Sequence, residues 1–247
     1  MEPLVVRNLI VADLFLPGAS RISDARSLRP RRDTADRHPP QPSGCREDLS
    51  VLFSHARFSN SRVLFDCARF THEWLAFDDA EFSGGQVSFI ETEVPRRVSF
   101  HRARFSGCQA DFSKVDFHLL DFTAAELSDQ VGFDYSWFTS GSRVSFAGAR
   151  FSGRRRLPVN DPEDSRGVFF HRATFAGDVS FARAQFSGRV SFASADFTGC
   201  RMFAFGGAEF SGGIVDFVTA RGSAPTGLVP ENGPPLPGIR LPPDWSS

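Results

Sequence analysis

One spacing dominates this sequence, because phenylalanine recurs at short and regular intervals between residues 53 and 217. In the stretch VSFARAQFSGRVSFASADF the rings fall at residues 181, 186, 192 and 197, so that intervals of five and six residues alternate. The same phase gives 28 positions from residue 53 to 222, and 25 of them are Phe. A generic core mixes side-chain shapes to fill irregular space. Such heavy use of one residue therefore indicates one repeated environment and a repeat protein. We call these 28 positions the centres.

The residue two positions before each centre alternates in size. It is bulky before the first centre of a pair, as at Val51 and Val63, and small before the second, as at Ala56 and Ala68. Residues two apart in an extended segment face the same side, so each unit directs one large and one smaller side chain inward. An amphipathic helix would need apolar residues three and four apart instead. The pattern predicts a β-solenoid, with Ser-Gly pairs such as 83–84 at its corners.

Several units resemble one known family. The segments ARFSG, ADFSK, AQFSG, ADFTG and AEFSG are similar to the pentapeptide repeat, whose consensus is A-(D/N)-(L/F)-x-x, and the resemblance covers residues 50–222. It implies an all-β fold, a right-handed quadrilateral parallel β-helix with four units per coil and hence about seven coils. The chain departs from the family pattern by inserting one or two residues after every second unit.

The flanks differ from the repeats in composition. We expect residues 1–19 to cap one end of the solenoid, and residues 20–49, rich in Arg and Pro, to form a disordered linker. Residues 223–247 contain seven Pro among several apolar residues, which predicts a tail that covers the last coil. The apolar segment 4–16 is too short and too polar to span a bilayer. With four Cys in no metal-binding spacing and no signal peptide, these features predict a cytoplasmic protein.

The sequence contains no motif that predicts catalysis. It has no GxSxG, P-loop or HExxH motif, and the five of its six His that lie in the repeats fall on several sides of the expected coils. Outward Asp and Glu occupy positions that must be polar in any case. We therefore expect no catalytic residue, no cofactor and no metal. The net charge of -1 also gives no field that would attract nucleic acid directly.

One insertion interrupts the phase, between residues 152 and 167. Insertions on a solenoid project from one edge and often bind partners. Grouped arginines can hold carboxylates or phosphates through forked donors, and nearby acidic residues could mask them. We take this segment as a candidate partner-binding loop, the alternative being a tolerated surface insertion. Its charged residues are Arg154, Arg155, Arg156, Asp161, Glu163 and Asp164.

These features favour a non-enzymatic structural or protein-interaction module with an unknown protein partner and, as a further possibility, end-to-end homodimers. The alternative comes from the resemblance, because some pentapeptide-repeat proteins mimic DNA and bind DNA gyrase. A mimic needs a strongly negative face, whereas residues 50–222 hold 19 Lys and Arg against 20 Asp and Glu. The four-unit register also predicts a ladder of alternating charge along one face: Arg57, Glu81, Arg104, Glu126, Arg150, Gln185 and Glu209.

Overall fold

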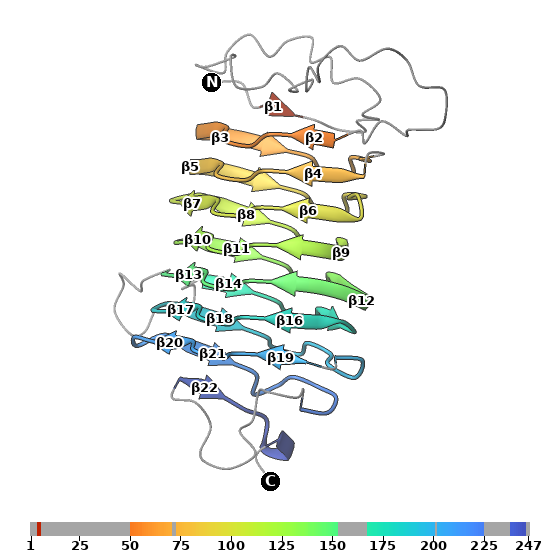
Figure 1. Cartoon of the computed structure of the whole chain (residues 1–247), viewed down its shortest axis with the longest axis vertical. Helices are drawn as coiled ribbons and strands as arrows, with labels where there is room; N and C mark the ends of the chain where they lie inside the picture. The colour runs from red at the N-terminus through yellow and green to blue at the C-terminus, as the bar shows by residue number, and fades with distance from the viewer. Residues whose placement is uncertain are drawn as a thin grey trace, which may run out of the picture.

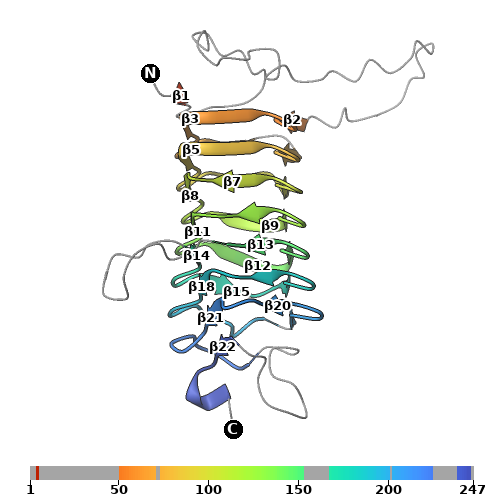
Figure 2. The same ribbon diagram turned by 90° about the vertical axis from the view of Figure 1, so that its left-hand side faces the viewer.

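The computed structural model describes residues 4–5, 50–70, 73–152, 167–200, 202–224 and 238–245. The described chain winds into a rod of stacked coils, with β1 (Leu4–Val5) at one end and the 3-10 turn η1 (Pro243–Trp245) at the other (Figures 1 and 2). Most of the predicted cap (1–19), the linker 20–49 and the charged loop lie outside the described residues.

The centres stack in four columns, so that each coil has four sides. We number the sides 1 to 4 by their first centres, Phe53, Phe58, Phe65 and Phe70. On side 1 each ring stacks on the next with centroids 4.8–5.3 Å apart. That column has seven members, hence seven coils separated by six steps: Phe53, Phe77, Phe100, Phe122, Phe146, Phe181 and Phe205. The all-β solenoid with four units per coil is therefore confirmed.

Short strands on each side pair in parallel with the coils above and below, because a five-residue unit leaves room for two or three extended residues before the chain turns. Side 1 and side 4 together form an 8-stranded sheet. Its members are β2 (Ser50–Leu52), β4 (Trp74–Ala76), β6 (Arg97–Ser99), β9 (Asp116–Asp121), β12 (Trp137–Ser145), β15 (Thr174–Phe175), β16 (Asp178–Ser180) and β19 (Phe203–Ala204).

Sides 2 and 3 form a 14-stranded sheet that includes β1 at its upper end. The strands of side 2 are β3 (Arg57–Leu64) and β5 (Glu81–Ser88), which both run on into side 3, and β7 (Arg104–Ser106), β10 (Glu126–Leu127), β13 (Arg150–Phe151), β17 (Gln185–Phe186) and β20 (Glu209–Phe210). Side 3 continues with β8 (Gln109–Asp111), β11 (Gln130–Gly132), β14 (Gly167–Phe169), β18 (Arg189–Ser191), β21 (Ile214–Asp216) and β22 (Ile239–Arg240).

The interior is built mainly of phenylalanine, with a valine or leucine beside most first centres of a pair and an alanine beside most second centres. Phe133 is fully buried and stacks on Phe112 and Phe170 at 5.0 and 4.9 Å. Its edge meets Phe122 at 5.7 Å, so rings of different columns pack edge to face. Both geometries are favourable for aromatic pairs. The alternation of large and small inward residues therefore has a direct cause, since four rings per coil leave space only for alanine beside half of them.

The tight corner after the first centre of each pair uses a left-handed residue, which the sequence did not indicate. His55 has φ of 61° and Asp79 has φ of 56°, and Ala56 N–H donates to Phe53 O at 3.0 Å to close the turn. A turn with positive φ at its third residue is of type II and favours Gly or Asn. Here Arg, Lys, Tyr and Ala occupy that position, so the coil-to-coil hydrogen bonds hold a conformation that these residues do not prefer.

The end of the tail lies on the last coil. Strand β22 adds to β21 in parallel, pairing Ile239 with Val215. Trp245 is 7% exposed, its ring lies 5.9 Å from that of Phe217, and its indole N–H donates to Gly222 O at 2.8 Å. Residues 238–245 thus lie against the last coil. Among the described residues, no helix has the length and apolar character needed to cross a membrane.

Candidate functional site

The charged loop that the sequence singled out cannot be placed, because residues 153–166 lie outside the described chain. Arg154, Arg155, Arg156, Asp161, Glu163 and Asp164 are all among them. Its two ends are described and lie on coil 5, where they bond to coil 4: Ser152 N–H donates to Leu127 O at 3.0 Å and Gly167 N–H to Asp129 O at 3.3 Å. In the next coil a single residue, Gly188, makes the same corner. The insertion therefore leaves from a normally closed corner between sides 2 and 3.

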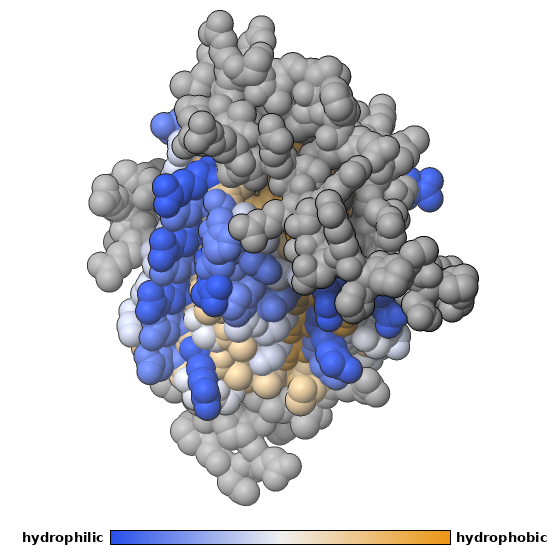
Figure 3. All heavy atoms as spheres, turned by 45° about the horizontal axis from the view of Figure 1, so that its top comes forward, coloured by the Kyte–Doolittle hydropathy of each residue, from blue (hydrophilic) through white to orange (hydrophobic). Residues whose placement is uncertain are grey.

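The predicted charge ladder is present on side 2. Arg57 pairs in register with Glu81, Glu81 with Arg104, and Arg104 with Glu126. The guanidinium of Arg57 lies 3.1 Å from the Glu81 carboxylate, and that of Arg150 lies 3.1 Å from the Glu126 carboxylate. Every cation of this ladder has an acidic or amide neighbour. Hydrophilic residues in rows along the rod are visible in Figure 3.

Next to this ladder runs a row of serines that sequence reasoning did not identify. Each follows a centre of side 2: Ser59, Ser83, Ser106, Ser128, Ser152, Ser187 and Ser211. Hydroxyls of neighbouring coils meet, as between Ser83 and Ser59 at 3.2 Å and between Ser152 and Ser128 at 3.1 Å. The signal in the sequence is a serine directly after every fourth centre, that is, once per coil. The row links coils and carries no charged group of its own.

One histidine makes contacts that resemble a catalytic arrangement. His171 Nε2 lies 3.2 Å from Ser191 Oγ, and His171 Nδ1 lies 3.5 Å from Asp134 Oδ1. Ser191, however, is 1% exposed. The adjacent N–H of Phe192 donates to Asp216 O at 2.8 Å within the coil ladder, so it is not available to stabilise an oxyanion. The arrangement therefore suits a structural hydrogen-bond line between three coils rather than nucleophilic catalysis.

The cysteines of the described chain are free thiols with different exposure. Cys67 is exposed, whereas burial raises the pKa of Cys108 and of Cys200 to about 12, which keeps both as neutral thiols.

At the corner of sides 1 and 2, two hydrogen bonds from the Arg102 guanidinium, 2.7 and 2.6 Å long, hold the pKa of Asp79 below its usual value. Within the described residues no group of three or more His, Cys, Asp or Glu is placed to hold a metal ion.

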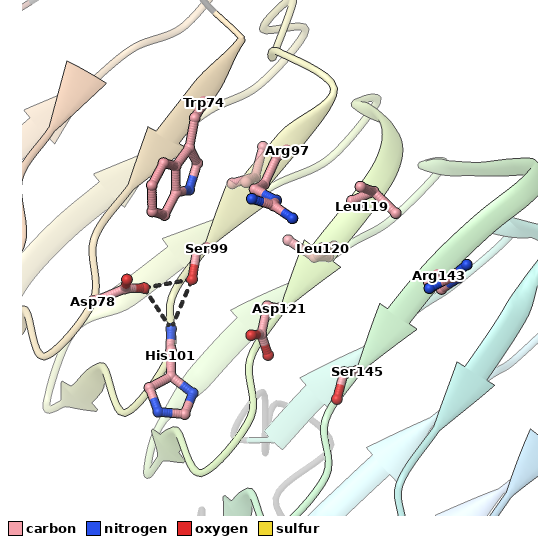
Figure 4. A pocket seen from close by; sticks show the side chains of 11 residues that line it. Trp74, Asp78, Arg97, Ser99, His101, Leu119, Leu120, Asp121, Arg143 and Ser145 are labelled. Atoms are coloured by element: carbon pink, nitrogen blue, oxygen red, sulfur yellow. Dashed lines mark hydrogen bonds between the residues drawn. The ribbon is translucent and has the colours of Figure 1, made fainter. Parts of the chain in front are cut away.

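A shallow depression on side 1 differs from the paired surface of side 2. Trp74, Arg97, Leu119 and Arg143 form one row across β4, β6, β9 and β12 (Figure 4), and the strand register pairs each with the next. The guanidinium of Arg97 lies 5.6 Å from the centre of the Trp74 ring. Arg97 and Arg143 are exposed, and neither forms an ion pair with a described residue. We call these four residues the side 1 row.

The carboxylates beside the side 1 row are already engaged. Asp78 accepts hydrogen bonds from the Ser99 hydroxyl and, at 3.2 Å, from the His101 backbone N–H (Figure 4). Asp121 accepts from the Thr123 N–H at 2.7 Å. These two acids serve neighbouring turns, and the row continues beyond Arg143 with Asp178, which is in register with Arg143 in the next coil.

Sequence reasoning missed the side 1 row, although each of its members stands three residues before a centre of side 1. That position was expected to hold outward polar residues of no special role. A second exposed cluster spans coils 4 and 5, where the ring of Tyr135 (44% exposed) meets the Arg172 guanidinium at 5.4 Å and Trp137 is 47% exposed. Unlike the side 1 row, its cation is already bonded, because Arg172 donates to the Tyr135 hydroxyl at 2.6 Å.

No protein-family model and no curated protein matches the chain. Among solved structures it resembles HetL, a pentapeptide repeat protein involved in heterocyst differentiation regulation from the cyanobacterium Nostoc sp. strain PCC 7120. The TM-score is 0.33 at 15% identity, over 70% of this chain and 74% of that chain. A likeness of this size says nothing about function. The fold itself, a parallel β-solenoid with a phenylalanine in nearly every five-residue unit, fits pentapeptide repeats.

Proposed function

We propose that this β-solenoid is a non-enzymatic scaffold that binds another protein through the flat surface of side 1. The observation that supports this most strongly is the contrast between two faces of one rod. On side 2 the charges compensate one another, whereas Arg97 and Arg143 of the side 1 row are exposed and form no ion pair with a described residue, and Arg97 lies over the ring of Trp74. Arginine and tryptophan are enriched among the residues that contribute most to protein interfaces.

The surface chemistry also favours binding over catalysis. The depression on side 1 is open and is formed by side chains on a regular sheet (Figure 4). Enzymes usually surround a substrate with convergent polar groups in a deeper pocket. The line from Asp134 through His171 to Ser191 lacks an accessible nucleophile, because only 1% of Ser191 is exposed.

The loop of residues 153–166 is a second proposed contact for the same partner. Its three consecutive arginines, at positions 154–156, would hold acidic or phosphorylated groups, and its acidic residues at 161, 163 and 164 would shield them in the free protein. The described ends support a clean test, because a single glycine makes the corresponding corner of coil 6. Replacing 153–166 by one Gly should therefore leave the coils intact.

The experiment compares three proteins in crosslinking and affinity capture from an extract of the cells that make the protein. These are the unaltered chain, the variant with 153–166 replaced by Gly, and Arg97→Glu/Arg143→Glu. Folding is checked first by circular dichroism and thermal melting. We expect a specific captured protein whose yield falls in at least one variant while the melting temperatures stay similar. Capture of no protein above background by the unaltered chain, or hydrolysis of a substrate by it, would refute the scaffold proposal.

The alternative, a DNA mimic that binds DNA gyrase, rests on the family resemblance. A mimic would present a continuous negative row, and the alternation from Arg57 to Glu126 on side 2 supports the scaffold instead. A supercoiling assay with purified gyrase separates the two, because a mimic should inhibit or protect the enzyme at micromolar protein and a scaffold for another partner should not. Cytoplasmic location and end-to-end association of two rods are separate proposals, tested by cell fractionation and by light scattering.

A further inference from the structure

The side 1 row has a spacing that suits one kind of partner. We propose, building on the scaffold function above, that it binds an acidic amphipathic α-helix lying along the rod, with apolar and acidic side chains alternating at the positions that face it. The row runs in the order Trp74, Arg97, Leu119 and Arg143, one residue per coil. It thus alternates aromatic or apolar with cationic groups in four consecutive coils (Figure 4).

The distances along the row match a helix. Parallel strands stack about 4.8 Å apart, so the four side chains start at about 0, 4.8, 9.6 and 14.4 Å along the axis. A helix rises about 1.5 Å per residue, so positions 0, 3, 7 and 10 on one face lie at about 0, 4.5, 10.5 and 15 Å. Every position agrees to within about 1 Å. An extended peptide repeats its face about every 6.6 Å and loses register by its second contact.

The chemistry of the row specifies the helix. Its two arginines have no ion-pair partner among the described residues, and they flank Leu119, which is half-buried. Carboxylates opposite Arg97 and Arg143 would make forked, charge-assisted hydrogen bonds. Apolar side chains opposite Trp74 and Leu119 would cover the half-buried surfaces of those two residues. The expected partner face therefore reads apolar, acidic, apolar, acidic at alternating intervals of three and four residues.

The probe is a fluorescein-labelled, stapled helical peptide of about five turns with Leu, Glu, Leu and Glu at those four positions and Ala and Gln elsewhere. Fluorescence anisotropy measures its binding to the full chain. A control peptide of the same composition places both Glu on the opposite face. We expect the in-phase peptide to bind at least about tenfold more tightly than the control peptide, with affinity that falls as salt rises.

Matched protein variants test which residues are responsible. Arg97→Glu/Arg143→Glu should weaken binding of the in-phase peptide by about tenfold or more, and a peptide with Lys in place of Glu should then bind this variant better than it binds the unaltered chain. The control variant, Arg62→Glu/Arg183→Glu, changes the net charge equally at two exposed arginines outside the row and should bind as the unaltered chain does. All variants are required to melt at similar temperatures.

Several outcomes would overturn the proposal: equal binding of both peptides, equal loss in both double variants, or no binding of the in-phase peptide. If the protein sediments with anionic phosphatidylserine vesicles and does not bind the peptide, the row binds a lipid surface and the helix proposal is refuted. The scaffold proposal is tested separately from the helix proposal. If the Arg97→Glu/Arg143→Glu variant still captures the cellular partner at full yield, the scaffold proposal stands and the side 1 row is not its binding site.

Discussion

Replacing Phe133 with alanine tests whether the stacked rings hold the coils together. The ring is fully buried and stacks on Phe112 and Phe170, in the coils on either side, at 5.0 and 4.9 Å. Deleting a buried phenylalanine ring typically costs about 3–5 kcal/mol of unfolding free energy, because the cavity collapses only in part. Here both flanking coils are covered by similar stacks, so little collapse is available. We therefore expect Phe133→Ala to lie near the upper end of that range.

The matched variant is Phe133→Leu. Leu127 occupies the equivalent inward position one corner earlier in the same coil and is 1% exposed, which shows that the solenoid accepts this shape. We expect Phe133→Leu to cost less than about 1.5 kcal/mol. Urea unfolding, followed by circular dichroism and by fluorescence of Trp137 in the same coil, measures both. Equal stability of the Ala and Leu variants would show that ring packing between coils does not determine stability.

Four further variants test the cover, the corners and the ladder. Trp245→Ala should lower the unfolding free energy by about 3 kcal/mol, since the indole covers the last coil and bonds to it; an unchanged melting temperature would mean that the cover is dispensable. Ala124→Gly should raise the unfolding free energy by about 0.5–1 kcal/mol, because φ of Ala124 is 58°. Its control, Ala147→Gly, lies at a neighbouring position outside the left-handed region and should lower the unfolding free energy. A change of the same sign in both variants would contradict the strained corner. Glu126→Gln removes two exposed ion pairs and should cost about 0.4–2 kcal/mol at low salt and less at about 1 M NaCl, so a salt-independent loss would argue against an electrostatic origin.

The sequence alone was enough to predict the interior of this protein and the register of its charge ladder. Each coil places four centres in its interior. The spacing of Phe and Ala along the sequence therefore allows only one register between neighbouring coils. Once that phase is known, residues such as Arg57 and Glu81 are neighbours, 24 positions apart, because the coil length places them there. The open ends of such a rod likewise require a cover, which is why the Pro-rich tail could be predicted to lie on the last coil.

The tertiary structure decided what the outward positions do. No packing requirement distinguishes Arg97 and Arg143 from Arg57 or Arg150 in the sequence, since all four point to solvent. Only the folded sheet shows that Arg57 and Arg150 meet carboxylates, whereas Arg97 and Arg143 form no ion pair with a described residue. The left-handed corners were also beyond sequence reasoning, because side chains that disfavour positive φ occupy them. Hydrogen bonds between coils impose that conformation, and those bonds exist only when the whole solenoid is assembled.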